Sequence, residues 1–236
     1  MSSHLLDTPI RAALTTRQAP LAEINGPARR YPTAIAPFAA LEDETSESWA
    51  ALHALMGPNE PAVFFTPEPV FAPPQFETVM AVTGEQMIGT PAEFSGPMPD
   101  MVTLGAADVP EMIALVELTK PGPFGVRTHE LGHFLGIRIG GRLAAMTGER
   151  MKPGSYTEMT AVCVHPDFRG RGYAQALLAA VSRGIVARGE IPFLHVFSEN
   201  HSAIALYKRQ GMTIRRRIHV TVLGRAGDNL KEKMPH

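Results

Sequence analysis

Residues 164–174, VHPDFRGRGYA, carry the strongest indication of how this chain folds. This stretch joins an apolar strand pattern to an amphipathic helix pattern through a turn that contains two glycines and an alanine. These small residues let successive backbone N–H groups point outward, because no large side chain obstructs them. The N–H groups come at a helix N-terminus, where partial positive charge collects. The turn is therefore predicted to hold a diphosphate, with Arg169 and Arg171 supplying charge for a further phosphate.

Regular helix and strand patterns surround this turn from Asp100 onward. Asp108, Pro110 and Glu111 are typical of a helix start, and Gly140-Gly141 is a hairpin turn signal. The predicted order is β-α-β-β-β-α-β-α-β over residues 100–225. Its predicted strands cover 101–104, 134–139, 142–150, 158–165, 191–198 and 212–223, and its helices begin near 108, 173 and 202.

Two motifs in this order resemble those of a known family. Arg169-x-x-Gly172-x-Ala174, after a strand that ends Val-x-Pro, resembles the acetyl-CoA pyrophosphate signature of the GNAT N-acyltransferases. The stretch NHSAIALYKRQGM, residues 200–212, is similar to a later motif of that family. The resemblance covers residues 100–225 and implies an α/β (α+β) fold with a mixed, mostly antiparallel twisted sheet flanked by helices. It also implies an enzyme that moves an acetyl (acyl) group from acetyl-CoA to a primary amine by direct attack in a ternary complex, without a metal.

The resemblance assigns the acetyl-CoA contacts residue by residue. Main-chain groups of a strand that splays from its neighbour would pair with the pantetheine arm, and the N–H of Val164 would face the thioester oxygen. Asn200 would hydrogen-bond the pantetheine, and backbone amides from Gly170 to Ala174 would hold the pyrophosphate. The implied binding set is Val162, Cys163, Val164, Arg169, Gly170, Arg171, Gly172, Tyr173, Ala174 and Asn200.

Two residues carry the implied chemistry. Tyr207 would protonate the departing CoA thiolate as general acid, since its high pKa keeps it protonated until the thiolate forms. Glu158 would take the proton of the attacking amine as general base. Each has an ordinary alternative: Tyr207 could be a packed aromatic, and Glu158 the exposed start of a strand. His195 is predicted to pack in the sheet more readily than to serve as a second base, and Cys163 to be a buried small residue.

The stretch HELGHFLGIR, residues 129–138, contains a competing signal. His129-Glu130-x-x-His133 is the spacing with which a helix binds zinc in metalloproteases. Prolines and glycines close on either side leave room for only a short helix, and Ile139 stands where a third histidine is needed. We therefore expect His129, Glu130 and His133 to be acceptor-side or surface residues. A zinc metalloprotease is the minor alternative.

Residues 1–95 form a separate, proline-rich region. A helix is predicted at 45–56, strands at 62–66 and 77–88, and a linker at 93–99. The region could be a degenerate first GNAT half, an accessory cap or a dimerisation element, and a homodimer is left open. The sequence does not choose among these roles.

Composition excludes several classes of protein. A formal net charge of −1 gives no electrostatic case for a nucleic-acid partner. No apolar run approaches the roughly 20 residues that a membrane span needs, and no secretory leader pattern is present. The single cysteine fits a reducing compartment, so a cytoplasmic protein is expected. The predicted acceptor is a small-molecule amine or a peptide N-terminus. A non-catalytic acyl-CoA-binding regulatory module remains the alternative to an enzyme.

Overall fold

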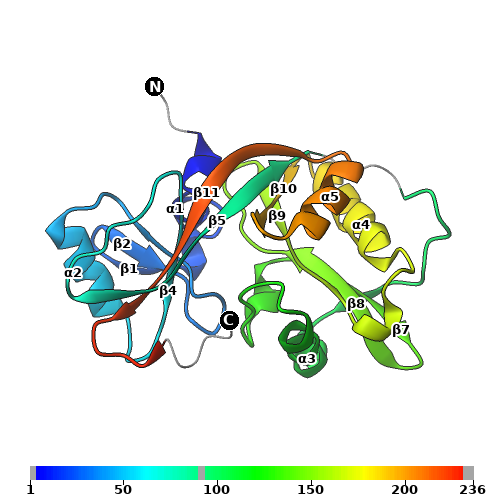
Figure 1. Ribbon diagram of the computed structural model, residues 1–236, viewed down its shortest axis with the longest axis horizontal. Coiled ribbons are helices and arrows are strands. Elements are labelled where there is room, and N and C mark those ends of the chain that lie inside the picture. The colour runs from blue at the N-terminus through cyan, green and yellow to red at the C-terminus, as the bar shows by residue number, and fades with distance from the viewer. Residues whose placement is uncertain (1–3, 90–93, 231–236) are drawn as a thin grey trace. The chain divides into compact units, whose positions relative to one another are not determined.

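The computed structural model describes residues 4–89 and 94–230 (Figure 1). These residues fold into two compact units. The first takes its described residues from Met1–Glu85, Met151–Gly154 and Arg217–His236, and the second from Gln86–Arg150 and Ser155–Arg216. The units therefore divide inside two long strands, β5 (Phe76–Ile88) and β11 (Thr213–Arg225). The boundaries 1–95 and 100–225 stay a prediction. Glu93 of the predicted linker lies outside the described residues, and residues 94–99 have no regular secondary structure.

The first unit holds a small antiparallel sheet and the end of a larger one. Its helices and strands are η1 (Leu5–Asp7), α1 (Pro9–Thr15), η2 (Ala19–Leu21), β1 (Glu23–Asn25), β2 (Ala28–Arg30), β3 (Ala39–Leu41), α2 (Ser46–Leu55) and β4 (Ala62–Thr66). Thr45 caps α2 by accepting a hydrogen bond from the Ser48 N–H, which confirms the predicted helix. Trp49 packs against Phe64 and Phe76 in the core of this unit.

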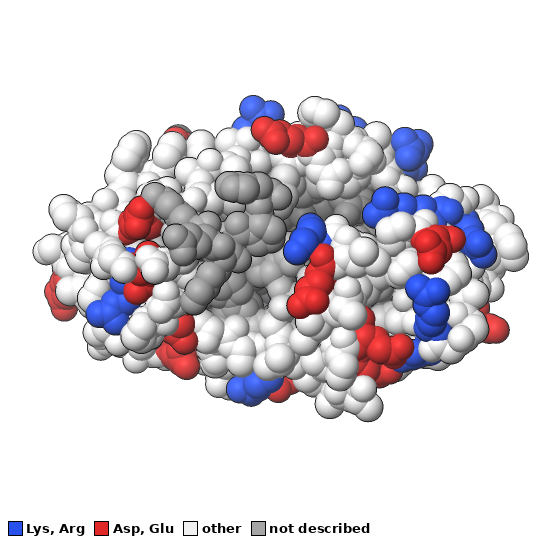
Figure 2. Space-filling model, turned by 60° about the horizontal axis from the view of Figure 1, so that its bottom comes forward, with Lys and Arg blue, Asp and Glu red and all other residues white. Residues whose placement is uncertain are grey.

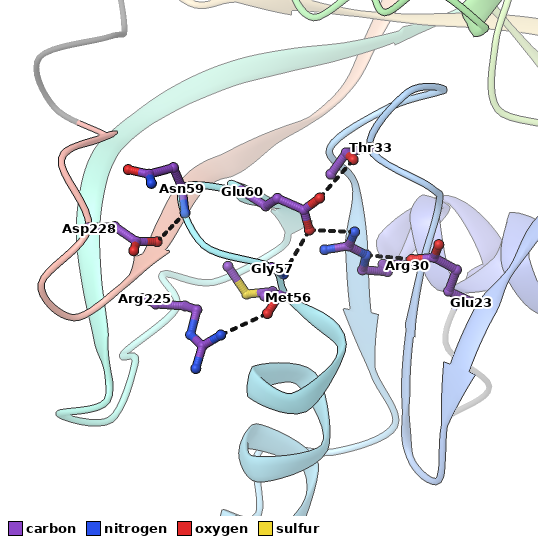
Figure 3. Close-up of polar contacts among 9 residues, drawn as sticks. All are labelled: Glu23, Arg30, Thr33, Met56, Gly57, Asn59, Glu60, Arg225 and Asp228. Atoms are coloured by element: carbon purple, nitrogen blue, oxygen red, sulfur yellow. Dashed lines mark hydrogen bonds and ion pairs between the residues drawn. The ribbon is translucent and has the colours of Figure 1, made fainter.

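Polar contacts bind the end of β11 to the loop after α2 within the first unit (Figure 3). The buried Arg30 guanidinium pairs with Glu23 and Glu60, each at 2.7 Å, and the Glu60 carboxylate also accepts the Gly57 N–H. The loop that follows α2 is also bound from the C-terminal part of the chain: Arg225 donates to the Met56 carbonyl, and Asp228 accepts the Asn59 N–H. The loop after α2 is therefore held by partners from both ends of the sequence.

Apart from the end of β11, the second unit contains the elements that the sequence predicts for residues 100–225. They are β6 (Val102–Leu104), η3 (Ala106–Asp108), α3 (Val109–Thr119), η4 (Thr128–Leu131), β7 (Phe134–Ile139), β8 (Arg142–Glu149), β9 (Tyr156–Val164), η5 (Pro166–Phe168), α4 (Tyr173–Ala187), β10 (Ile191–Phe197) and α5 (His201–Arg209). The predicted order of helices and strands is confirmed. Asp108 differs in detail, because its side chain accepts the Gly105 N–H and makes no cap bond to α3.

The eight-stranded sheet has the order β4-β11-β5-β10-β9-β8-β7-β6. The pairs β6–β7, β7–β8, β8–β9 and β4–β11 are antiparallel, whereas β9 and β10 are parallel. This mixed, mostly antiparallel sheet with flanking helices confirms the fold class that the resemblance implied. The position of β5 was not predicted: a strand from the N-terminal part of the sequence lies between β10 and β11.

Helices cover both faces of the sheet in the second unit. Leu178 and Val181 of α4 and Tyr207 of α5 pack with Met159 of β9 on one face. Met112 and Leu115 of α3 pack with residues of β7 and β8 on the other face. Burial of the apolar stripe of α4 is the packing that its sequence periodicity predicts. Figure 2 shows acidic and basic side chains interspersed over the visible face of the molecule, without a single-signed field on that face.

Candidate active site

The two parallel strands β9 and β10 separate part of the way along their length. Their pairing runs from Ile191↔Tyr156 to Phe193↔Glu158, although β9 continues to Val164 and β10 to Phe197. Beyond the Glu158 level, the edge of β9 that faces β10 has no paired strand in this register. The predicted splay is thus present, and residues 162–164 lie in it.

A bulge in β9 orients the backbone of this open edge. Ala161 has φ of +51°, and the register with β8 shifts between Met146 and Gly148. The His165 N–H donates to the Ala144 carbonyl of β8 at 2.9 Å. Since successive residues of a strand alternate in direction, the N–H of Val164 points away from β8, toward the opening. Its predicted contact with the thioester oxygen is consistent with this direction.

The turn between β9 and α4 has the conformation that its glycines require. Gly170 and Gly172 have φ of +76° and +77°, in the left-handed region that side chains disfavour. Gly172 is the N-cap of α4, so the first N–H groups of the helix point out of this turn. A Cβ on Gly172 would lie 3.3 Å from the ring of Phe94. The turn thus combines exposed amides with a helix N-terminus, which is the geometry of an anion cradle.

Basic side chains surround the cradle. The guanidinium groups of Arg142 and Arg171 lie 5.7 and 5.3 Å from the centre of the Phe168 ring. Arg169 is within 3.5 Å of the Val164 carbonyl. Phosphate binding by Arg169 and Arg171 stays a prediction.

Tyr207 packs on the α4 and α5 face of the sheet and Cys163 on the α3 face, yet the two side chains are close enough to interact electrostatically. Tyr207 is 7% exposed, and burial, with a smaller contribution from Cys163, raises the pKa of its hydroxyl. Burial also raises the pKa of the Cys163 thiol to about 12, against a small opposing effect of a hydrogen bond with Thr119. Cys163 is therefore a buried neutral thiol, as expected, while its role through the main chain stays a prediction. A protonated tyrosine beside β9 is suited to donate a proton there.

Asn200 caps α5 with its side-chain oxygen. That oxygen accepts the Ala203 N–H at 3.1 Å and the Ser202 hydroxyl at 3.0 Å. The predicted bond to pantetheine would therefore have to use the side-chain NH₂ group.

Glu158 lies at the branch point of the splay and is fully buried rather than exposed at a strand end. The Arg150 guanidinium donates two hydrogen bonds to its carboxylate, of 2.8 Å from Nε and 2.7 Å from Nη2. His195 Nδ1 lies 2.8 Å from the same carboxylate. Burial alone would raise the pKa of Glu158, but Arg150 and then His195 outweigh burial and lower the pKa to about 2. A carboxylate with so low a pKa is a weak base. The general-base role of Glu158 stays a prediction.

His195 connects Glu158 to two further residues that sequence reasoning did not select. Its Nε2 lies 2.9 Å from the side-chain nitrogen of Gln86 on β5, and the side-chain oxygen of Gln86 accepts a 2.7 Å bond from Arg215 of β11. Because Arg215 fixes the Gln86 amide, the amide nitrogen donates to His195 Nε2. In this arrangement Nδ1 of His195 is the ring nitrogen that donates to Glu158. No periodic or motif signal marks Gln86 or Arg215 in the sequence.

The HELGH stretch does not form the helix that a zinc protease requires. Residues Thr128–Leu131 make a single 3₁₀ turn, and Gly132 has an extended backbone. Glu130 pairs with Arg127, and His133 is exposed just before β7. Among residues 4–89 and 94–230, no three histidine, cysteine or acidic side chains are grouped as a metal ion would need. The two histidines therefore lack the shared helical face on which their spacing depends.

A mixed sheet with one parallel pair that splays beside a glycine cradle defines the class of fold, and comparison with known proteins gives the family. A crystal structure of a GNAT-family protein from Novosphingobium aromaticivorans is 40% identical, with a TM-score of 0.85 over 95% of this chain and all of that one. This chain belongs to the GNAT family. A GCN5-related N-acetyltransferase structure from Kribbella flavida shares the fold at 13% identity, with a TM-score of 0.61 over 94% of this chain and 98% of that one.

A family model and several curated sequences each match part of the chain. Residues 134–220 match the model of the family described as FR47-like protein. The N-alpha-acetyltransferase RimI of Mycobacterium tuberculosis is 35% identical over 83 residues, which are 34% of this chain and 51% of that protein. An acetyltransferase of Yersinia enterocolitica is 42% identical over 48 residues, which are 20% of this chain and 33% of that protein. The chain thus spans a third to a half of the length of these curated relatives. In the part of the chain that the structure describes, no helix is long and apolar enough to cross a membrane.

Proposed function

We propose that the chain is an acetyl-CoA-dependent N-acetyltransferase. The observation that carries the proposal is the opening between β9 and β10, which runs from the branch point at Glu158 to the glycine turn before α4. An extended thioester arm could pair with the open edge of β9 while its pyrophosphate binds the amides of the turn. Membership of the GNAT family and the 40% identical relative support the same activity.

In the proposed reaction, the acceptor nitrogen attacks the carbonyl carbon of the thioester in a ternary complex. The new C–N bond forms first and gives a tetrahedral oxyanion, which the N–H of Val164 stabilises, and the C–S bond then breaks as the carbonyl re-forms. Tyr207 donates its proton to the departing thiolate and recovers one from the amide nitrogen through solvent. Val162, Cys163 and Val164 would contact the pantetheine arm, and residues 169–174 with Asn200 the rest of the cofactor.

The proposed acceptor is a primary amine, either a small molecule or a peptide N-terminus. The printed name of the Mycobacterium tuberculosis relative, an N-alpha-acetyltransferase, supports the second choice. A cytoplasmic location stays a prediction that rests on the single, buried cysteine.

Turnover with a panel of amines tests the proposal against a non-catalytic acyl-CoA-binding module. Amino acids, short peptides with free N-termini, polyamines and aminoglycosides are each incubated with acetyl-CoA, and release of free CoA is measured. We expect acceptor-dependent release with at least one amine class. Saturable acetyl-CoA binding without release for any amine would favour the binding module.

The protease alternative makes a separate prediction about metal. Because the HELGH stretch forms only a 3₁₀ turn and no α-helix, the purified protein is expected to hold no stoichiometric zinc by elemental analysis. Chelators should leave acetyl transfer unchanged, since no proposed step uses a metal. One zinc per chain that is lost in His133→Ala would restore the metalloprotease hypothesis.

A further inference from the structure

Five side chains form one continuous hydrogen-bonded ladder across the sheet at the level where β9 and β10 part. In order they are Arg150, Glu158, His195, Gln86 and Arg215. They come from the loop after β8 and from the strands β9, β10, β5 and β11. All five lie in the second unit, and Arg150, Glu158 and Gln86 are buried. The ladder therefore joins four adjacent strands at the branch point.

The ladder occupies the groups that would otherwise accept a proton from the substrate. One Glu158 oxygen accepts from Arg150 Nη2 and His195 Nδ1, and the other accepts from Arg150 Nε. His195 has its proton on Nδ1 and its lone pair toward the Gln86 amide. Protonating Glu158 would therefore break a buried bidentate ion pair, and protonating His195 would break its bond with Gln86. Among the described residues, Arg150 contacts Glu158 directly and Arg215 reaches His195 through Gln86.

We propose that Glu158 is a positioning residue that anchors this ladder, and that the acceptor amine enters the site already uncharged, which favours α-amino groups over lysine-like amines. The inference rests on the acetyltransferase function proposed above. The protons balance without an enzyme base. An ammonium ion gives its extra proton to solvent before it binds. After the neutral nitrogen attacks, the remaining N–H proton is the one that the CoA thiol needs, delivered through Tyr207.

The size of the preference follows from the amines themselves. An α-amino group has a pKa of about 7.7–8.0 and a lysine amine of about 10.4. At pH 7 about a tenth of an α-amino group is neutral, whereas roughly one part in 2,500 of a lysine amine is neutral. The neutral fraction that can react therefore differs by about 250-fold between the two amines. An enzyme with an effective base in the site could reduce this difference, whereas one that depends on solvent deprotonation retains it.

The pH dependence of the wild-type enzyme gives the first test. A short peptide with a free N-terminus is compared with the same peptide acetylated at its N-terminus and carrying one lysine, and kcat/KM is measured by CoA release from pH 6 to 10. We expect kcat/KM to rise about tenfold per pH unit below the pKa of the acceptor, so that the N-terminal peptide levels off near pH 8 while the lysine peptide still rises at pH 10. At pH 7 the free N-terminus should react on the order of 100-fold faster. Equal rates for the two peptides, or an inflection fixed near one pH for both, would overturn the inference.

Paired substitutions give the second test. Glu158→Gln leaves Arg150 buried without its countercharge, so reduced activity and thermal stability are expected. Adding Arg150→Met removes the second charge of the pair as well. The double variant should have a kcat/KM at least tenfold higher than that of Glu158→Gln, and the inflection of its pH profile should still lie at the pKa of the acceptor. A general base cannot be restored by removing its counter-ion. A double variant that folds and binds acetyl-CoA, yet stays as inactive as Glu158→Gln, would therefore assign the base to Glu158.

The two proposals fail in different ways. If the wild-type protein releases no CoA with any amine, the acetyltransferase function fails. If it acetylates amines but shows a fixed inflection or no rescue, only the positioning role and the amine preference fail.

Discussion

Gly172→Val is expected to abolish measurable acetyl-CoA binding. Gly172 has φ of +77°, which a β-branched residue adopts only with strain, and it caps α4 at the point where the pyrophosphate is proposed to bind. A side chain there would also cover the amides of the turn and meet the Phe94 ring. We expect binding to weaken by about 100-fold or more in isothermal titration calorimetry, because strain and obstruction act together.

Gly141→Val is the matched control for backbone strain. Gly141 has φ of +83° in the β7–β8 hairpin, and nothing lies within 4 Å of its Cβ position. A comparable loss of thermal stability is expected there, without loss of acetyl-CoA binding. Undiminished calorimetric binding in Gly172→Val would mean that the cofactor's pyrophosphate lies elsewhere.

Tyr207→Phe is expected to lower kcat by about 10²–10⁴-fold, the range that loss of a general acid typically gives. Burial raises the pKa of the Tyr207 hydroxyl, so it stays protonated across the working pH range and can serve the thiolate when it forms. The ring is retained, so its packing with Met159 and Leu178 should survive. The KM for acetyl-CoA should change little, because the lost interaction matters only as the C–S bond breaks.

Tyr31→Phe is the control for removing a buried tyrosine hydroxyl. The Tyr31 hydroxyl donates to the Gln18 side chain at 2.8 Å in the first unit. Its loss should cost about 1 kcal/mol in the free energy of unfolding and leave kcat unchanged. Single-turnover measurements establish that chemistry limits the rate before the two variants are compared. If Tyr207→Phe then reacts at the wild-type rate, the proton comes from solvent or another residue.

Elements with a local signature could be predicted from the sequence. The glycine turn, the capping residues Thr45 and Asn200, and the apolar stripe of α4 each depend on residues a few positions apart. Such patterns reflect backbone geometry within one turn of helix or one strand, so they are visible without tertiary information. The same locality explains why HELGH misleads. Its spacing has meaning only on an α-helix, and the surrounding glycines and prolines leave a 3₁₀ turn.

The order of helices and strands, the cradle before α4 and, through the family resemblance, the fold could all be inferred from the sequence. The position of β5 between β10 and β11, and the contacts of Glu158 with Arg150 and His195, became known only from the folded chain. The reason is separation along the chain. Gln86 and Arg215 meet across 129 residues, and strand pairing over such distances depends on which sheet edges compete for a partner. Side chains brought together in this way leave no periodic trace, so the basicity of a predicted catalytic carboxylate depends on partners that the sequence does not reveal.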